Sequence, residues 1–319
     1  MEQRALGSEG LLSSAIGYGA MGISMAYGDS EDDGARAIGA ALDAGVTHFD
    51  TAELYGWGEN ERRVGAALAA RRDEVVIATK FGFTHDYGFD SRPDHIREVV
   101  RNSLRNLGTD RIDVLYQHRL DPRVPIEEVA AAVRDLIRAG DVRYFGLSEV
   151  GEDTIRRAHA VQPLSVVQTE YSLFEREVES VLPVLRELGI GLVAYSPLGR
   201  GFLTGTAKPA GEYQEGDMRN TDPRWQPGSF ERNVATTEQL AALARTLDAS
   251  VGQLALAWLL SRDPHLVPIP GSRSASRVRE NVAAAELRLD AATLDRIAEI
   301  LPDGGFGARY TPENMPDWG

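Results

Sequence analysis

The sequence has no cysteine among its 319 residues, which excludes disulfides, thiolate zinc sites and cysteine nucleophiles. Lysine is scarce: of the 34 lysine and arginine residues, only Lys80 and Lys208 are lysine, and the other 32 are arginine. Positive charge is also outnumbered, since the formal net charge at pH 7 is −14. We therefore expect no nucleic-acid partner and no electrostatic attachment to an anionic membrane.

Long hydrophobic runs are missing as well. No apolar stretch approaches the roughly 20 residues that cross a bilayer, and Met1–Ala5 lacks the apolar core of a signal peptide. Together with the lack of cysteine, this predicts a cytoplasmic protein without a membrane span. At 43% hydrophobic and 26% charged residues, the composition is that of an ordinary globular chain. Its length allows one large α/β domain or two smaller ones.

Short apolar runs rich in Val, Ile and Tyr recur along the whole chain, and helical patterns fill most of the gaps between them. These runs lack clean polar alternation, as expected of parallel strands that are covered on both faces. Eight strands are predicted: Ala15–Tyr18, Val46–Phe49, Val75–Thr79, Ile112–Gln117, Tyr144–Leu147, Ser165–Thr169, Gly191–Tyr195 and Leu266–Ile269.

The helical patterns carry start and stop signals, namely Ser, Pro or acidic residues at the start and Gly at the end. Strand–helix alternation repeated eight times predicts one (β/α)8 barrel, a TIM barrel, as a single domain over residues 1–319. A hairpin at 4–13 is expected over the barrel bottom, and the long segments 198–234 and 302–319 are expected to be functional loops. The predicted helices include those that begin at Ser30–Asp33, Ser91, Pro125, Glu177 and Ala275.

Polar side chains stand at the carboxyl ends of the predicted strands, where a (β/α)8 barrel carries its active site. Each one alone has a solvated loop residue as its simplest interpretation, but a set spaced by the strand repeat predicts one shared mouth. The set is Asp50, Lys80, Gln117, His118, Ser148, Glu149, Gln168, Tyr195, Ser196, Gly271, Ser272 and Arg273.

Tyr55 follows Asp50 by five residues and completes a coherent acid–base group. A tyrosine with its usual pKa near ~10 is a poor acid at neutral pH, and a nearby Lys80 ammonium is expected to lower that pKa by stabilising tyrosinate. Lysine suits this task because its pKa can shift, whereas arginine stays protonated. Asp50 would hold the ammonium, and His118 would bond a carbonyl oxygen. Reduction by this group requires a bound hydride donor, because no side chain supplies a hydride.

The segment Gly17–Gly22 matches the GxGxxG dinucleotide fingerprint. No helix is predicted to open there, so we expect no Rossmann fold. Gly19 and Met21 are instead expected where the backbone turns after the first strand and approaches a cofactor.

With these residues in place, the chain resembles the aldo-keto reductase superfamily over nearly its whole length. It looks closer to the bacterial, plant and potassium-channel β-subunit branches than to the aldose reductase branch. The segments that carry the resemblance are Phe49–Gly56, Ala78–Lys80, Asp113–His118, Gly146–Ser148, Ala194–Gly201 and Ile269–Ser272, followed by Arg277 and Glu280–Asn281.

The resemblance implies a barrel that binds NADPH in an extended form and reversibly reduces an aldehyde or ketone. It implies a catalytic tetrad of Asp50, Tyr55, Lys80 and His118, with Tyr55 as the acid. Ser148 and Gln168 would bond the nicotinamide carboxamide, and Tyr195 would stack on its ring. Ser196, Leu198 and Arg200 would line the pyrophosphate, and the adenosine end would be held by Ser272, Arg273, Arg277 and Asn281. The other candidate cofactor-binding residues are Gly19, Met21, Gly271 and Glu280.

Two positions depart from the family pattern. Glu149 stands where many members have asparagine, and Gly271 stands where many have lysine. The first change concerns the contact with the carboxamide, and the second concerns the preference for NADPH over NADH.

The substrate is expected to be a small carbonyl compound. Trp57, Tyr27 and Trp225 are candidates for its pocket, and the oligomeric state stays open between monomer and homo-oligomer. No histidine pair has metal-binding spacing, so no metal site is predicted. Two other functions remain: a lyase that uses Lys80 as a Schiff-base nucleophile, and a regulatory subunit that binds NADPH and turns over slowly.

Overall fold

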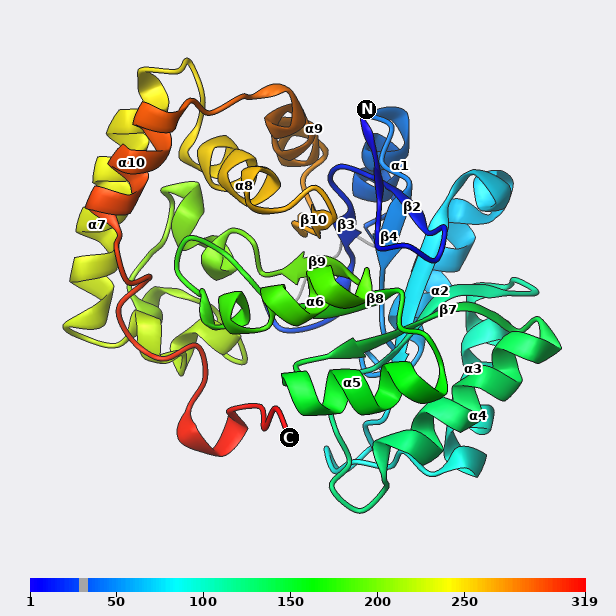
Figure 1. Cartoon of the computed structure of the whole chain (residues 1–319). Coiled ribbons are helices and arrows are strands. Elements are labelled where there is room, and N and C mark those ends of the chain that lie inside the picture. The colour runs from blue at the N-terminus through cyan, green and yellow to red at the C-terminus, as the bar shows by residue number, and fades with distance from the viewer. Residues whose placement is uncertain (29–33) are drawn as a thin grey trace.

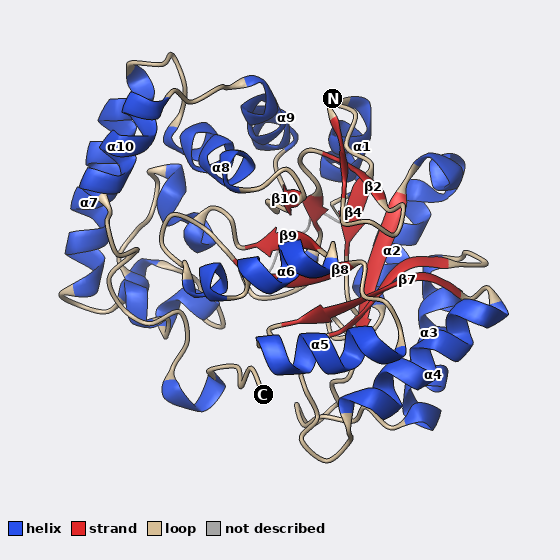
Figure 2. Ribbon diagram, in the orientation of Figure 1, coloured by secondary structure: helices blue, strands red, loops and turns tan. Residues whose placement is uncertain are grey.

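The structure is a computed structural model that describes residues 1–28 and 34–319. It confirms the barrel. Eight parallel strands neighbour one another in chain order, and Figure 2 shows them in red at the centre with helices around them. They are β3 (Tyr18–Gly19), β4 (His48–Asp50), β5 (Val76–Phe81), β6 (Ile112–Gln117), β7 (Val142–Ser148), β8 (Val166–Glu170), β9 (Gly191–Tyr195) and β10 (Leu266–Pro268).

The ends of the sheet meet where β3 comes beside β10. The Gly17 amide donates to the Pro268 carbonyl at 2.9 Å. A side chain on Gly19 would bring its Cβ to 2.7 Å from the Ile269 oxygen, so only glycine allows this approach. The first strand, β3, is shorter than the predicted run Ala15–Tyr18 and begins at the last residue of that run. Ala15 still bonds Glu2 of the N-terminal hairpin.

The helices cover the outside of the barrel (Figure 1). The predicted helix at 177–188 divides into a 3₁₀ turn, Glu177–Ser180, and α6, because Pro183 suits the first turn of a helix but not its interior. The predicted start at Ser30–Asp33 lies outside the described residues. The helices are α1 (Ala35–Asp43), α2 (Glu59–Leu68), α3 (Pro93–Leu107), α4 (Ile126–Ala139), α5 (Glu152–Val161), α6 (Leu182–Leu188), α7 (Ser229–Arg245), α8 (Val251–Arg262), α9 (Ala275–Ala283) and α10 (Ala291–Ile300).

The predicted hairpin is confirmed as the antiparallel pair β1 (Gln3–Ala5) and β2 (Leu12–Ser14). Leu6 and Leu11, at its turn, are buried against the valines of the barrel interior. The hairpin thus closes the bottom of the barrel with apolar side chains and leaves the carboxyl ends of the strands as the open face.

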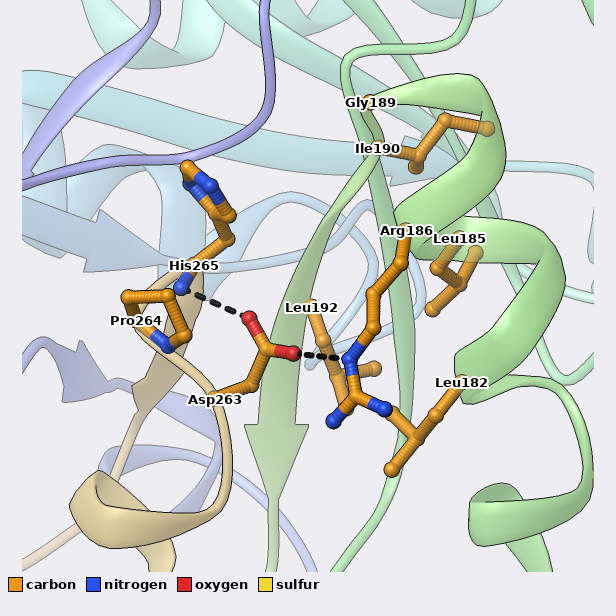
Figure 3. A pocket seen from close by; sticks show the side chains of 9 residues that line it. All are labelled: Leu182, Leu185, Arg186, Gly189, Ile190, Leu192, Asp263, Pro264 and His265. Carbon is orange, nitrogen blue, oxygen red and sulfur yellow. Dashed lines mark hydrogen bonds and ion pairs between the residues drawn. The ribbon is translucent and has the colours of Figure 1, made fainter.

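A hollow of about 280 Å³ lies at the opposite end from those carboxyl ends, between α6 and the segment before β10. Figure 3 shows it closed on one side by Asp263, which accepts from Arg186 Nε at 2.7 Å and from the His265 amide at 2.9 Å. No residue of the predicted site lines it.

Two long segments cross the carboxyl-end face, which we call the mouth. Residues 198–228 form short 3₁₀ turns linked by loops, whereas the last part of the predicted segment, residues 229–234, begins α7. The tail, residues 302–319, follows α10 and ends beside α5 (Figure 1). Among the described residues, no helix is both long and apolar enough to cross a membrane.

Candidate active site

Lys80 lies at the centre of a compact buried group at the ends of β4 and β5. Its Nζ lies 2.5 Å from Asp50 Oδ1, 2.7 Å from the Thr51 carbonyl and 3.2 Å from Tyr55 Oη. The lysine side chain is 1% exposed. The ammonium thus uses its three hydrogens on three oxygens, and one of these belongs to the tyrosine that the sequence places in the site.

His118, at the end of β6, completes the set. Its ring lies 5.9 Å from the Tyr55 ring, centroid to centroid, and nearly perpendicular to it. The structure therefore brings together Asp50, Tyr55, Lys80 and His118, which are spread over 69 positions of the chain. Parallel strands produce this convergence because all their carboxyl ends lie on one face.

The charges in this group follow from burial and pairing. Burial by itself would lower the pKa of Lys80, but Asp50 and Tyr55 outweigh it and raise that pKa, so the side chain stays an ammonium. Burial raises the pKa of Tyr55, although Lys80 opposes the rise. Lys80 thus lowers the pKa of Tyr55 as the sequence predicts, but desolvation is the larger effect and the net shift is upward.

His118 is held neutral. Burial, together with the positive charges of Lys80 and Arg119, lowers its pKa well below the usual value for histidine. A neutral imidazole presents one N–H donor and one acceptor. Beside it, the second Asp50 oxygen accepts from Gln168 Nε2 at 2.7 Å, which fixes the carboxylate that holds Lys80.

The group predicted for the adenosine end lies at the start of α9. Ser274 caps this helix through its hydroxyl, and Ser272 and Arg273 precede it. Arg273 donates to the carbonyls of Tyr27 and Gly28, while Arg277 is exposed. Within residues 1–28 and 34–319 no carboxylate pairs with either arginine. Guanidinium and hydroxyl donors at a helix N-terminus suit a phosphate, so these residues fit the 2′-phosphate end of NADPH.

The remaining predicted cofactor residues border the mouth in different ways. Gly19 and Gly271 form the narrow β3–β10 junction, and Met21 opens a 3₁₀ turn, not an α-helix. Ser196 has a left-handed φ of 48° directly after β9. Ser148 and Gln168 are buried, Tyr195 and Leu198 are half-buried, and on α9 Asn281 is buried while Glu280 is exposed.

Arg200 requires a correction. Its side chain is 2% exposed and points to carboxylates: Nη2 lies 2.8 Å from Glu170 and Nη1 lies 2.6 Å from Asp222. Arg224 bonds the other Glu170 oxygen at 2.9 Å. The Arg200 guanidinium therefore joins the long loop to β8 and does not face a pyrophosphate as predicted.

One of the three predicted pocket aromatics, Trp225, lies in the core. Trp225 is 2% exposed and packs on Phe202 at 4.1 Å in the core, so its assignment to the substrate pocket is corrected. Tyr27 lies on the α9 side of the mouth, with Arg219 5.0 Å above its ring, and burial raises its pKa to about 12. Trp57 remains beside the acid–base group by its place after Tyr55.

An aromatic wall beside His118 was missed from the sequence. The Phe83 ring lies 5.0 Å from the His118 ring and 5.3 Å from Phe89, and Trp57 stacks on His85 at 4.0 Å. Phe83, His85 and Phe89 stand in the turn that follows Lys80, whereas Trp57 comes from the turn after β4. The alternating aromatics of 81–89 directly after a strand-end lysine were the signal that could have identified this wall.

Comparison with known proteins decides the family. The family model described as "Aldo/keto reductase family" matches residues 15–302. The chain belongs to this family. Among curated relatives, it is 40% identical to the aldo-keto reductase yakc [NADP(+)] of Schizosaccharomyces pombe, over 93% of this chain and 92% of that protein. It is also 40% identical to the probable aldo-keto reductase 1 of Glycine max, over 96% and 90% respectively.

Solved aldo-keto reductases have the same fold. The glycerol dehydrogenase AKR11B4 from Gluconobacter oxydans superposes with a TM-score of 0.87 at 29% identity, covering 98% of both chains. The holo form of the aldo-keto reductase AKR11C1 from Bacillus halodurans gives 0.81 at 28% identity, covering 99% of this chain and 100% of that one. As an aldo-keto reductase, the protein is an oxidoreductase.

Proposed function

We propose that this aldo-keto reductase uses NADPH to reduce a small aldehyde or ketone to an alcohol, with Tyr55 as the proton donor. The observation that carries the proposal is the contact of Lys80 Nζ with Tyr55 Oη at 3.2 Å while Asp50 holds the same ammonium at 2.5 Å. The arrangement gives a tyrosine hydroxyl a fixed positive charge at the point where its negative charge would develop.

NADPH, when bound, would supply the hydride for the carbonyl carbon. The chain supplies the proton and the charge. Tyr55 donates its proton to the carbonyl oxygen, and the Lys80 ammonium stabilises the tyrosinate that remains. His118, neutral, donates a hydrogen bond to the same oxygen and orients the carbonyl. In the reverse direction, tyrosinate takes the proton from an alcohol, so the same residues serve oxidation by NADP⁺.

The binding roles follow the positions described above. Arg273, Arg277 and Ser272 would hold the 2′-phosphate end, and Ser148, Gln168 and Tyr195 the nicotinamide end. We further propose that residues 1–319 act as a single domain, as a monomer or homo-oligomer. A cysteine-free chain also fits a cytoplasmic location, which cell fractionation tests.

The charge of Lys80 opposes the Schiff-base alternative. A lysine nucleophile has to be neutral, whereas Asp50 and Tyr55 raise the pKa of Lys80. Borohydride trapping with a bound carbonyl compound distinguishes the two, since only a lyase would be labelled at Lys80. The slow regulatory subunit is distinguished by tight NADPH binding with negligible turnover over a carbonyl panel.

The first test is a fluorescence titration with NADPH and, separately, with NADH, in the wild type and in Arg277→Ala. Loss of a charged hydrogen bond costs about 1.5–3 kcal/mol, so NADPH should bind roughly tenfold to a hundredfold more weakly. NADH, which lacks the 2′-phosphate, should bind the two proteins alike. An equal loss for both nucleotides would remove Arg277 from the phosphate site, and no binding of either would overturn the reductase assignment.

A further inference from the structure

At position 149 of the mouth, this chain has glutamate where many family members have asparagine. The Glu149 side chain is fully buried, with 0% exposure. Its backbone has a left-handed φ of 58°, which is unusual for a residue with a side chain. Its carboxylate accepts from the Glu170 amide at 3.0 Å and from Tyr195 Oη at 2.7 Å. A buried carboxylate needs such donors, because without them its desolvation is costly.

The same carboxylate also holds the tail. Arg309 lies 2.7 Å from Glu149 Oε2 with its side chain 2% exposed, and Trp318 Nε1 donates to Glu149 Oε2 at 3.0 Å. Two residues on, the Gly151 amide donates to the Trp318 carbonyl at 2.7 Å. Glu149 therefore fastens both the middle and the end of the tail to the carboxyl end of β7.

Tyr195 connects this anchor to the proposed nicotinamide end. A carboxylate only accepts hydrogen bonds, so Tyr195 has to donate its hydroxyl hydrogen to Glu149. Tyr310 Oη lies 3.2 Å from Tyr195 Oη, and Tyr310 has to be the donor in that contact. The position of the Tyr195 hydroxyl is thus set by Glu149 on one side and by a tail residue on the other.

We propose that Glu149 is a positioning residue that makes the tail part of the nicotinamide pocket, by fixing Tyr195 and the tail with one carboxylate. The inference rests on the proposed function, in which the Tyr195 ring stacks on the nicotinamide. Arg200 reinforces the link, since it donates to the Arg309 carbonyl and its guanidinium lies 4.3 Å from the Tyr310 ring centroid. The tail thereby controls how the nicotinamide is presented to the carbonyl.

The test variant is Glu149→Gln, which keeps the size but replaces one acceptor oxygen with an NH₂ donor. That donor would face Arg309, Trp318 or Tyr195, which also donate. In the protein without nucleotide, amide hydrogen exchange at Gly151 and over 302–319 should become at least about tenfold faster, as expected when local opening becomes easier. This readout needs neither cofactor nor substrate.

With NADPH, the expected effect is on hydride transfer and not on affinity. A misplacement of about 1 Å can cost on the order of a hundredfold, so kcat should fall between roughly tenfold and a hundredfold while KM for NADPH changes less than about threefold. The primary isotope effect with 4-deuterated NADPH should rise, because hydride transfer becomes more limiting. The emission maximum of bound NADPH should also shift, with or without turnover.

Glu177→Gln is the matched control. Glu177 pairs with the same Arg309 at 3.1 Å but is 55% exposed, and no contact joins it to Tyr195 in the described structure. It should leave kcat, isotope effect and emission at wild-type values. Trp318→Phe, which removes one tail donor, should change them in the same direction as Glu149→Gln but less.

Faster tail exchange in Glu149→Gln with wild-type kcat, isotope effect and emission would make the contact purely structural and overturn the proposal. If the wild type binds NADPH but reduces no carbonyl, the proposed function fails, and the emission shift alone decides the positioning role: a shift supports it and none overturns it. If NADPH does not bind, both proposals fall.

Discussion

The two sides of the mouth hold their carboxylates with different cations. At β4–β6 a single lysine, Lys80, meets Asp50 and Tyr55 within 3.2 Å. At β7–β9 three arginines, Arg200, Arg224 and Arg309, join carboxylates at the ends of β7 and β8, in the long loop and in the segment after β8. Lysine offers a compact charge next to a proton donor, whereas the arginine fork bridges two acceptors at fixed geometry.

The groups that transfer a proton and the groups that hold the loops thus lie on different sides of one ring of strand ends. The lysine side concentrates the groups that hold and move a proton. The arginine side fastens residues 198–228 and the tail, which consist of short 3₁₀ turns and loops, over the barrel. A chain with only two lysines places one of them where the pKa of a neighbour has to be influenced.

Lys80→Arg tests this difference most directly, because it places an arginine at the position where the protein uses a lysine. The larger planar group cannot occupy the space between Asp50, Thr51 and Tyr55, so kcat should fall by on the order of 10²–10⁴-fold, the usual contribution of general acid catalysis. Steady-state kinetics measures this. Lys208→Arg, the exposed control, should change nothing, and a Lys80→Arg enzyme with wild-type kcat would end the argument about lysine.

Arg224→Leu tests the arginine side. It removes a 1%-exposed guanidinium from Glu170 and Glu175 and leaves buried carboxylate charge with fewer partners. Loss of one partner of a buried pair costs roughly 3–5 kcal/mol, measurable as the free energy of unfolding in urea. The exposed pair Arg296–Glu299 is the control, since Arg296→Leu should cost no more than about 1 kcal/mol. Equal losses would mean that burial of the network contributes nothing.

His48 gives the lysine side a pH-dependent stability that can be measured. It lies two residues before Asp50 on β4, and burial lowers its pKa to about 4; neither ring nitrogen has a hydrogen-bond partner among the described residues. The unfolded chain takes up this proton near pH 6.5 and the folded chain only near 4. The contribution of neutral His48 to the free energy of unfolding is therefore fully present above pH 6.5. It falls by up to about 3 kcal/mol as the pH drops to 4. Urea unfolding between pH 7.5 and 5 should show a weaker pH dependence in His48→Leu; an unchanged slope would exclude this histidine.

Much of the lysine side was predictable from sequence. Asp50, Lys80 and His118 each stand at the end of an apolar run, and in a parallel barrel that position alone brings side chains to one face. The barrel fold was predicted from the alternation of these apolar runs with helical patterns. Burial of Tyr55 was not readable from the sequence, so the sequence did not show that desolvation outweighs the effect of Lys80 on the pKa of this tyrosine.

The arginine side was largely unpredictable. Glu149 and Arg309 are 160 residues apart, and the segments that carry Arg200, Trp225 and Arg309 have no periodicity from which a partner could be inferred. Their positions depend on ion pairs between loops, and the sequence shows only that charged residues of both signs are present. Arg200 and Trp225 were consequently placed at the cofactor and substrate when they lie inside the protein.

The central claim is that Tyr55 delivers the proton, and Tyr55→Phe tests it with the smallest change, the loss of one hydroxyl. NADPH affinity from the fluorescence titration and kcat for a carbonyl substrate should be measured on the same preparation. The account predicts an NADPH dissociation constant within about threefold of wild type and a kcat lower by roughly 10²–10⁴-fold. A Tyr55→Phe protein that still reduces the carbonyl at the wild-type rate would contradict it.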